Sequence, residues 1–554
     1  MLSVIANWGY MAFTLFMMGY LFSHIIKKIS GYEIKSINGI ISAGIVAATV
    51  YSQIFSCLHK VGAAANVIML SVCIAAFAAL RKDIFSCLAQ NMRHASRFIR
   101  LGIPVLILIW AFCASRGYMH YDSDLYHAQS IRWIEEYGVV KGLGNIHLRF
   151  AYNSSFFALS ALYSMSFLGC QSLHAVNGFL ALMLSVEVLG LSRLPKLKKI
   201  RLSDFARLAA FYYLTTIYGE ITSPASDYAI MCAVFFIIIK WLSLTEENTK
   251  SAAPYALICV GCVYAVTLKL TAGFILLLAV KPACMLIKEK RWKDIALYIF
   301  MGVAVILPWI IRNIIISGYL LYPFPELDIF NVDWKIPAEM AAIDAAEIKT
   351  WGRGLYNSAL VNLPITDWFP HWFSETLPAL GKLFIVLDIL CIILLIAAVI
   401  FKPIRTAVLT PDNCLAIAAA AASYIFWQLS APLLRYGYAY VLLMIFLTAG
   451  ILAGQLCGRK AFWKVFIAFL ALFSAVKFIT LARHINNELE KPYYVKQQDY
   501  GAYELDSFEI NGVRFYYPQS GDRVGYDAFP AIPRKMSISL IGADIADGFK
   551  SASD

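Results

Sequence analysis

Charged residues are scarce in this sequence. Only 15% of its 554 residues are Asp, Glu, Lys or Arg, whereas 60% are hydrophobic, and the mean hydropathy is +0.67. A chain of this composition has too little polar surface to fold in water around a single core. The sequence therefore predicts an all-α polytopic membrane protein.

Cysteine is missing from every long polar stretch of the chain. The twelve cysteines lie in apolar segments or at their edges, and none occurs in residues 116–152, 312–376 or 481–554. This distribution argues against a disulfide framework and against a zinc site. We accordingly expect no metal site, and the residues alone assign no cofactor.

Positive charge is absent from the start of the chain, where the first basic residues are His24 and Lys27. Without a basic n-region, the first apolar segment is predicted to be a retained anchor with its N-terminus outside, not a signal peptide. The net charge is +12. Because Lys and Arg gather in short clusters between apolar runs, this charge is typical of cytoplasmic membrane loops and not of nucleic-acid binding.

Apolar segments long enough to span about 30 Å of hydrocarbon recur along the chain, and they predict about 14 crossings. They lie near residues 5–26, 37–58, 62–80, 101–115, 172–192, 204–219, 224–242, 253–269, 270–287, 294–311, 378–401, 412–430, 437–456 and 461–480.

Lys and Arg clusters predict the orientation of these segments, since such clusters remain in the cytoplasm. The clusters lie near residues 27–35, 81–100, 193–207 and 288–293, at Lys402 and Arg405, and at 459–464. Both termini are then expected outside. The predicted regions are N-terminal helices (1–100), a transmembrane module (101–311) with its first extracytoplasmic loop at 116–152, a large extracytoplasmic loop (312–376), C-terminal helices (377–480) and an extracytoplasmic tail (481–554).

Residues 153–169 break the parity of this topology. They are apolar enough to cross, but a crossing here would move the basic cluster RLPKLKKIR at 193–201 to the outside. Since the charge bias is the stronger rule for a short loop, residues 153–169 are predicted to be juxtamembrane or re-entrant and packed under the first loop.

Two further polar regions are expected to cover the outer face. In the tail, alternating apolar residues flank Asn511–Gly512 in SFEINGVRFYYP, which predicts a type I′ hairpin within a small α/β cap. In 312–376, the run DWFPHWF at 367–373 suits a membrane interface. It either anchors its loop or lines a groove for a lipid substrate.

The first polar loop carries the strongest catalytic candidates, Asp122 and Asp124. Exposed loop acids are usually only solvated. Here they lie at the start of a helix among aromatic residues that include Tyr126. Such surroundings partly remove a carboxylate from water and raise its pKa, which suits a general base. We therefore predict a catalytic role for Asp122 and Asp124.

A second acid, Asp227 in ITSPASDYAI, is predicted on the same side of the membrane. It lies in the first turn of a helix, so it either caps that helix or joins Asp122 in one site. Two basic residues also lie between crossings on this side, Lys269 in TLKLTAGF and Arg435 in WQLSAPLLRYGYAY. Each either snorkels to the interface or binds a lipid-linked phosphate.

The order of these motifs resembles the GT-C superfamily of membrane glycosyltransferases, and its protein-mannosyltransferase-like branch most. The resemblance rests on the acidic loop YDSD after an outward helix, an amphipathic juxtamembrane helix, a basic turn, the second acidic loop SPASD and the lysine turn LKLTAG. More narrowly, YDSDLYHAQSIRWIEEYGVVKGLGNIHLRFAYNSSFF, WQLSAPLLRYG and GADIADGFK resemble a family of large bacterial membrane proteins of that type.

The resemblance implies an inverting glycosyltransferase of the bacterial inner membrane. It would use a sugar on a polyprenyl phosphate, in cell-surface polysaccharide or glycolipid biosynthesis. The first-loop acid, Asp122, would activate the glycan, lipid or protein acceptor, and Asp227 and Lys269 match the second acid and the lysine turn. The family's frequent Asp-Glu pair is replaced by Asp-Ser-Asp, which leaves the role of Asp124 open. Tyr126, His127 and Arg132 are assigned to substrate or phosphate binding.

Two other function classes compete with this one. The first is a polysaccharide polymerase or ligase, and the second is a transporter or flippase of lipid-linked glycans. A transporter favours inverted repeats with broken helices near the middle of the membrane. The sequence shows no internal repeat, and its acids lie at the outer boundary, which favours the enzyme.

Overall fold

The computed structural model describes residues 1–194, 200–400, 411–454 and 460–551, and within these ranges it consists mainly of helices. The prediction of a helical membrane protein is confirmed. The α-helices are α1 (Leu2–Ser30), α2 (Ile37–Leu58), α3 (Ala63–His94), α4 (Arg97–Ser115), α5 (Ala128–Glu136), α6 (Ser155–Tyr163), α7 (Val176–Val188), α9 (Leu202–Ile217), α10 (Ser226–Glu246), α11 (Ala252–Leu268), α12 (Val280–Lys288), α13 (Trp292–Ser317), α14 (Ala338–Gly352), α15 (Ile365–His371), α16 (Ala379–Ile400), α18 (Pro411–Leu429), α19 (Leu434–Gly454) and α20 (Lys460–Glu488).

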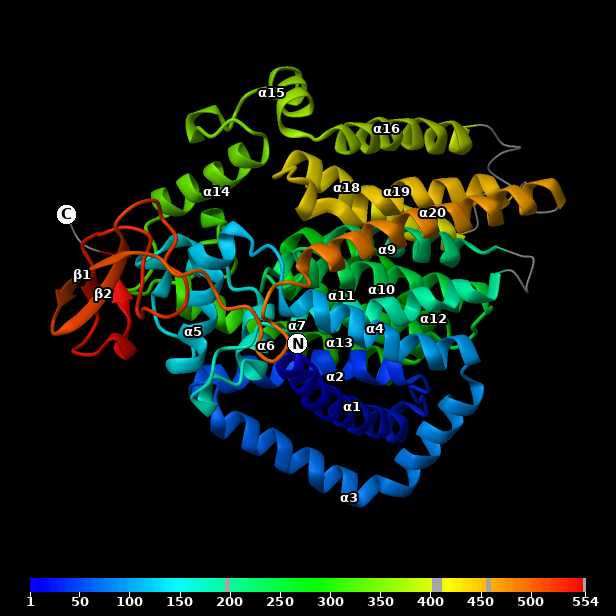
Figure 1. Ribbon diagram of the computed structural model, residues 1–554, viewed down its shortest axis with the longest axis horizontal. Helices are drawn as coiled ribbons and strands as arrows, with labels where there is room; N and C mark the ends of the chain where they lie inside the picture. Colours follow the sequence, from blue (N-terminus) through cyan, green and yellow to red (C-terminus); the bar gives the residue numbers. More distant parts are fainter. Residues whose placement is uncertain (195–199, 401–410, 455–459, 552–554) are drawn as a thin grey trace.

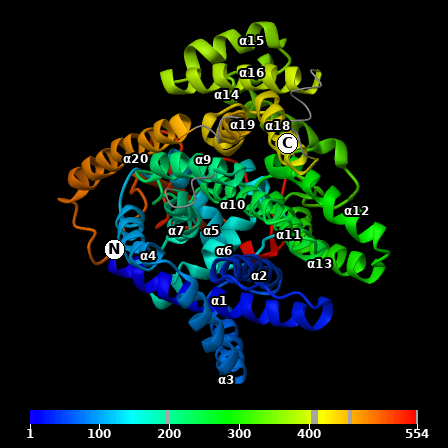
Figure 2. The ribbon, with the colours of Figure 1, turned by 90° about the vertical axis from the view of Figure 1, so that its right-hand side faces the viewer.

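The long helices run side by side along the long axis of the molecule, and the view along that axis shows them as one bundle (Figures 1 and 2). Small residues allow close packing where helices meet. At the contact of α1 with α2, a Cβ on Gly19 would lie 1.8 Å from the carbonyl oxygen of Ile40, so only glycine fits. Such contacts are typical of membrane helices, whose association depends on close packing.

Eleven helices in the described part of the chain are long and apolar enough to cross a membrane. They identify a multi-pass membrane protein. Where they are described, the segments predicted to cross are mainly helical. However, α9 (16 residues) and α11 (17 residues) are shorter than these eleven, and α18 is not among them either. The number of crossings therefore stays a prediction.

Residues 153–169 contain one short buried helix, α6, which is followed by a 3₁₀ turn (Ser166–Leu168) that is not buried. All nine residues of α6 are buried, and the helix packs against α5 and α2. At about 1.5 Å per residue, nine residues span roughly 14 Å, which is too short to cross the hydrocarbon. This arrangement agrees with the expectation that the segment packs beneath the first loop.

The tail contains the predicted hairpin. Strands β1 (Leu505–Ile510) and β2 (Val513–Pro518) pair antiparallel, and Asn511 and Gly512 between them have φ of 52° and 81°, as a type I′ turn requires. A second small sheet pairs β3 (Ser539–Leu540) with β4 (Phe549–Lys550).

We call residues 499–551 the cap. Its apolar side chains share one buried cluster with the first loop, because Phe515 and Phe549 of the cap and Trp133 and Phe150 of the loop belong to the same core. Figure 1 shows the cap at one end of the bundle, beside α5 and α14. We refer to this end as the cap end.

The start of the chain also lies at the cap end. The amide of Leu2 donates to the carbonyl of Tyr494 at 2.9 Å, and that of Ser3 donates to Val495 at 3.0 Å. The beginning of α1 and the tail therefore share one side of the bundle, as the charge pattern predicts. Several of the basic residues behind that prediction, at 195–199, Lys402, Arg405 and Arg459, lie outside the described residues.

The sidedness can be tested with a natural cysteine. Cys170 is exposed, and its neighbour Gln171 bonds the carbonyl of Gln497, so it lies at the cap end. We expect an impermeant maleimide to label Cys170 in intact cells and a Cys170→Ser variant to lose that label. In the Cys170→Ser background, Lys198→Cys should be labelled only after the cells are opened. Labelling of Lys198→Cys in intact cells would refute both the topology and a shared extracytoplasmic site.

Candidate active site

The first polar loop is fixed to the second acidic loop by its main chain. The amide of Tyr118 donates to the carbonyl of Gly219 at 2.8 Å, and that of His120 donates to Ser223 Oγ at 2.7 Å. At Gly117, with φ of 145°, a Cβ would lie 2.5 Å from the Gly219 carbonyl oxygen. This close approach needs glycine and brings the start of the first loop beside the segment that leads into α10.

Two acids and two cations from four separate segments meet at this junction. Arg435 Nη2 donates to the carboxylate of Asp122, and Arg435 Nε lies 3.5 Å from Asp227 Oδ2. Lys269 Nζ contacts Asp227 Oδ1 at 2.5 Å. The charges thus alternate in the order Asp122, Arg435, Asp227, Lys269, and we call these four residues the ion cluster.

Helix ends position the members of the ion cluster. Lys269 is an extended residue (φ −161°, ψ 133°) between α11 and the 3₁₀ segment η6 (Leu270–Ala279). The helix therefore ends at the residue whose amine joins the cluster. Arg435 lies in the first turn of α19, close to Gly437, whose Cβ would lie 2.4 Å from the Trp427 ring. Asp227 lies in the first turn of α10, where Ala225 is the N-cap and no side chain caps the helix.

His120 and Tyr436, which were not predicted from the sequence, complete the cluster. Arg435 also bonds the His120 ring, and Tyr436 Oη lies 3.0 Å from Arg435 Nη2. Lys269 Nζ stands 3.3 Å above the centroid of the Tyr436 ring, a cation–π contact. The signal available for both was proximity alone, since His120 stands two residues before Asp122 and Tyr436 follows Arg435.

The expectation of a raised pKa at Asp122 was wrong. Burial does raise the pKa of this carboxyl, but the positive charge of Arg435 outweighs burial and leaves the pKa below its ordinary value. Asp122 is therefore a carboxylate at neutral pH. Its side chain is 20% exposed, so it remains accessible from the cap end.

Tyr126 and His127 line the inner side of the cluster. They lie in the π-helical turn η1 (Ser123–His127), their rings are 4.3 Å apart, and the His127 ring packs 5.3 Å from that of Phe157. His127 is only 2% exposed, and burial lowers its pKa to about 3. The imidazole is thus neutral, so it can exchange hydrogen bonds but brings no charge to a phosphate.

Asp124 and Arg132 contact the cap and not the ion cluster. The carboxylate of Asp124 accepts from the Gly501 amide at 3.0 Å and from Tyr503 Oη at 2.8 Å. Arg132 donates to the Asp527 carbonyl at 2.6 Å and stacks on the Tyr526 and Phe529 rings. Both residues therefore anchor the cap, and the catalytic role of Asp124 and the substrate-binding role of Arg132 stay predictions.

The aromatic run at 367–373 supports the segment that carries Arg435. Trp372 is fully buried, its indole donates to the Pro432 carbonyl at 2.9 Å, and its ring packs 6.2 Å from that of Trp427. These contacts favour the anchoring interpretation over a lipid groove.

Buried neutral histidines at the cap end predict a dependence of stability on pH. Burial lowers the pKa of His174 to about 4, and its ring lies 4.7 Å from that of Tyr500 in the cap. The unfolded chain takes up a proton at each buried histidine below about pH 6.5, whereas the folded chain does not. The free energy of unfolding therefore falls as the pH drops from about 6.5 towards 4.

Melting curves between pH 7 and 5 should show a smaller decrease in melting temperature for His174→Phe than for the wild type. His94→Phe, at an exposed position, should not change the decrease; if both variants match the wild type, His174 plays no part.

The described residues hold no group of three or more His, Cys, Asp or Glu side chains placed to bind a metal ion. The groups that the ion cluster itself offers for chemistry are its acids, its cations and Tyr436. Lys has three N–H donors and Arg has five, so both cations can donate hydrogen bonds to further oxygen atoms beyond those of the two carboxylates. Arg and Lys placed together at a membrane boundary suit a phosphate group.

Residues 1–442 match the model of a family described as a domain of unknown function (DUF8201). The chain belongs to the DUF8201 family. The ion cluster and Tyr436 lie within the matched residues, whereas the whole cap lies beyond them. No curated protein and no solved structure matches the chain.

Proposed function

We propose that this member of the DUF8201 family is a membrane glycosyltransferase of the GT-C type. It would transfer a sugar from a polyprenyl-phosphate-linked donor to a hydroxyl group of a glycan, lipid or protein acceptor on the extracytoplasmic face. The observation that carries the proposal is the ion cluster, in which two acids and two cations from four distant segments converge at the cap end.

In this mechanism Asp122 is the general base. The acceptor hydroxyl gives its proton to the Asp122 carboxylate as its oxygen attacks the anomeric carbon. The bond between that carbon and the phosphate oxygen breaks, and the phosphate leaves with the electron pair. Lys269 and Arg435 stabilise the negative charge that develops on the leaving phosphate.

The pairing of Asp122 with Arg435 has a role in this scheme. A carboxylate held by a guanidinium is a weak base, because the contact favours the charged form. A donor phosphate competes for Arg435 and so releases Asp122 for proton transfer. The base is then active only when the donor is bound, which limits unproductive reactions.

The test is release of the carrier. Purified protein in liposomes, supplied with a panel of polyprenyl-phosphate sugars and acceptor glycans, should form free polyprenyl phosphate together with a glycosylated acceptor. A ligase or polymerase would give the same products with long acceptors only. Movement of the intact lipid-linked glycan across the bilayer without release would identify a flippase and refute the enzyme.

A further inference from the structure

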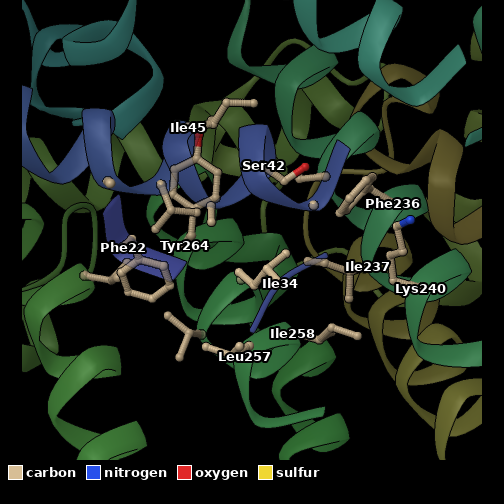
Figure 3. A pocket seen from close by; sticks show the side chains of 18 of the residues that line it. Phe22, Ile34, Ser42, Ile45, Phe236, Ile237, Lys240, Leu257, Ile258 and Tyr264 are labelled. Atoms are coloured by element: carbon tan, nitrogen blue, oxygen red, sulfur yellow. The ribbon is translucent and has the colours of Figure 1, made fainter. Parts of the chain in front are cut away.

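An apolar groove lies between α2 and the pair α10 and α11, with α7 and α13 completing its walls (Figure 3). Its cavity volume is about 670 Å³, and no residue of the ion cluster lines it. α2 packs mainly on α1, α6 and α13, and its contacts with α11 are few. A space in the range of ligand sites is therefore left among these helices, of which α2, α7, α10 and α13 are candidate membrane spans.

Small side chains create this space. Gly39, Ala43 and Ala47 follow one another at four-residue intervals along α2 and line the groove, and Gly261 of α11 lines it too. A Cβ on Gly261 would meet no atom within 4 Å. The lining of an apolar cavity of this size needs packing partners that the protein does not supply, and between membrane helices hydrocarbon chains of the bilayer suit that role.

The groove has a polar end and an apolar end. Lys240, Ser243 and Glu247 line one end, where α10 finishes, whereas Tyr264 and Leu268 of α11 line the other. Figure 3 shows Lys240 and Tyr264 on opposite sides of the groove. Lys240 pairs with Glu187 at 2.6 Å, and this pair uses one of its three N–H donors. The side chain of Lys240 is 27% exposed, so the other two donors can reach another acceptor.

We propose that this groove binds a phospholipid of the surrounding bilayer, with an acyl chain beside Ala47 and Gly261 and its phosphate at Lys240. The match is one of polarity, since an amphiphile has one charged end and one long apolar part, as the groove does. The exposed Lys35, just before α2, adds positive charge at the same end. This lipid is distinct from the proposed sugar carrier, because the two phosphates would lie at opposite ends of the groove. The phospholipid phosphate would lie at Lys240, whereas the carrier phosphate would lie at Lys269, directly after Leu268 at the apolar end.

Cross-linking tests this site without any assay of transfer. The protein is placed in nanodiscs of phosphatidylethanolamine and phosphatidylglycerol, part of it carrying a photoreactive group near the end of an acyl chain. We expect cross-links at residues 43–47 of α2 and 258–264 of α11. Gly261→Leu fills the groove and should lower their yield about tenfold, because several buried methylene contacts of the chain are lost.

Gly9→Leu is the matched control. A Cβ on Gly9 also meets no atom within 4 Å, but Gly9 is exposed on α1 and does not line the groove. This variant should keep the wild-type yield, and leucine favours a helix over glycine at both positions. Equal yields in the two variants, or cross-links spread over the outer surfaces of α3 and α16, would refute a built site. Displacement of the probe by polyprenyl phosphate but not by unlabelled phosphatidylglycerol would assign the groove to the carrier and refute the phospholipid.

Discussion

Asp122→Asn is expected to abolish sugar transfer while leaving the protein folded and able to bind its lipid donor. The amide keeps the size of the carboxylate and most of its hydrogen bonds, but it cannot take a proton. The loss is that of a general base, about 10²–10⁴-fold in rate. Because the change also frees Arg435 from its carboxylate partner, affinity for polyprenyl phosphate should not fall. The measurement is transfer in membranes at matched expression, beside binding of polyprenyl phosphate.

Asp124→Asn is the paired control, two residues away in the same loop. Its carboxylate accepts two hydrogen bonds from the cap, so the variant should lose about 1–3 kcal/mol of stability and show a cap that proteases remove more readily. Transfer by the protein that remains folded should continue. Full activity of Asp122→Asn, or equal loss of transfer in the two variants at matched folding, would leave the mechanism without its base.

Lys269→Ala and Arg435→Ala are expected to weaken use of the donor far more than use of the acceptor. Both cations are assigned to the phosphate, and loss of a desolvated charged contact costs about 2–5 kcal/mol. That is roughly 30-fold to several-thousand-fold in the dissociation constant of polyprenyl phosphate. Equilibrium binding of polyprenyl phosphate to protein in nanodiscs measures the effect.

Loss of Lys269 has a second consequence that needs its own control. Asp227 is 8% exposed, and it would lose its closest partner, which by itself destabilises a folded chain. The double variant Lys269→Met with Asp227→Asn removes both charges, and it should recover stability but not affinity. Unchanged donor affinity in Lys269→Ala and in Arg435→Ala would remove the phosphate site from the proposal.

The positions of the ion cluster could be predicted because a charge at the end of an apolar segment is costly and stands out. Asp122, Asp227, Lys269 and Arg435 each occur at such an end, and the charge bias put all four on one side. The partners within the cluster could not be predicted. The contact between Arg435 and Asp122 joins residues 313 positions apart, and only the packing of α19 beside the first loop brings them together.

The division of work between Asp122 and Asp124 also depends on tertiary structure. In the sequence the two acids look equivalent, and both were predicted to be catalytic. The structure turns Asp124 towards Gly501 and Tyr503, residues that the sequence places in a separate tail. The pKa of Asp122 was misjudged for the same reason, because burial was visible in the pattern of apolar residues and the guanidinium was not.

The shared core of the cap and the first loop cannot form until the end of the chain has been synthesised. Trp133 is fully buried in that core, yet Phe515, which packs in the same core, is synthesised 382 residues later. At about 5–20 residues per second, the ribosome needs roughly 20–80 s to bridge that interval. During this time the face of α5 that carries Trp133 lacks its partners from the cap, so the nascent protein has to shelter it against the lipid surface or on a chaperone. Chains that stall before the cap emerges would be recognised by quality-control proteases through the same unprotected loop.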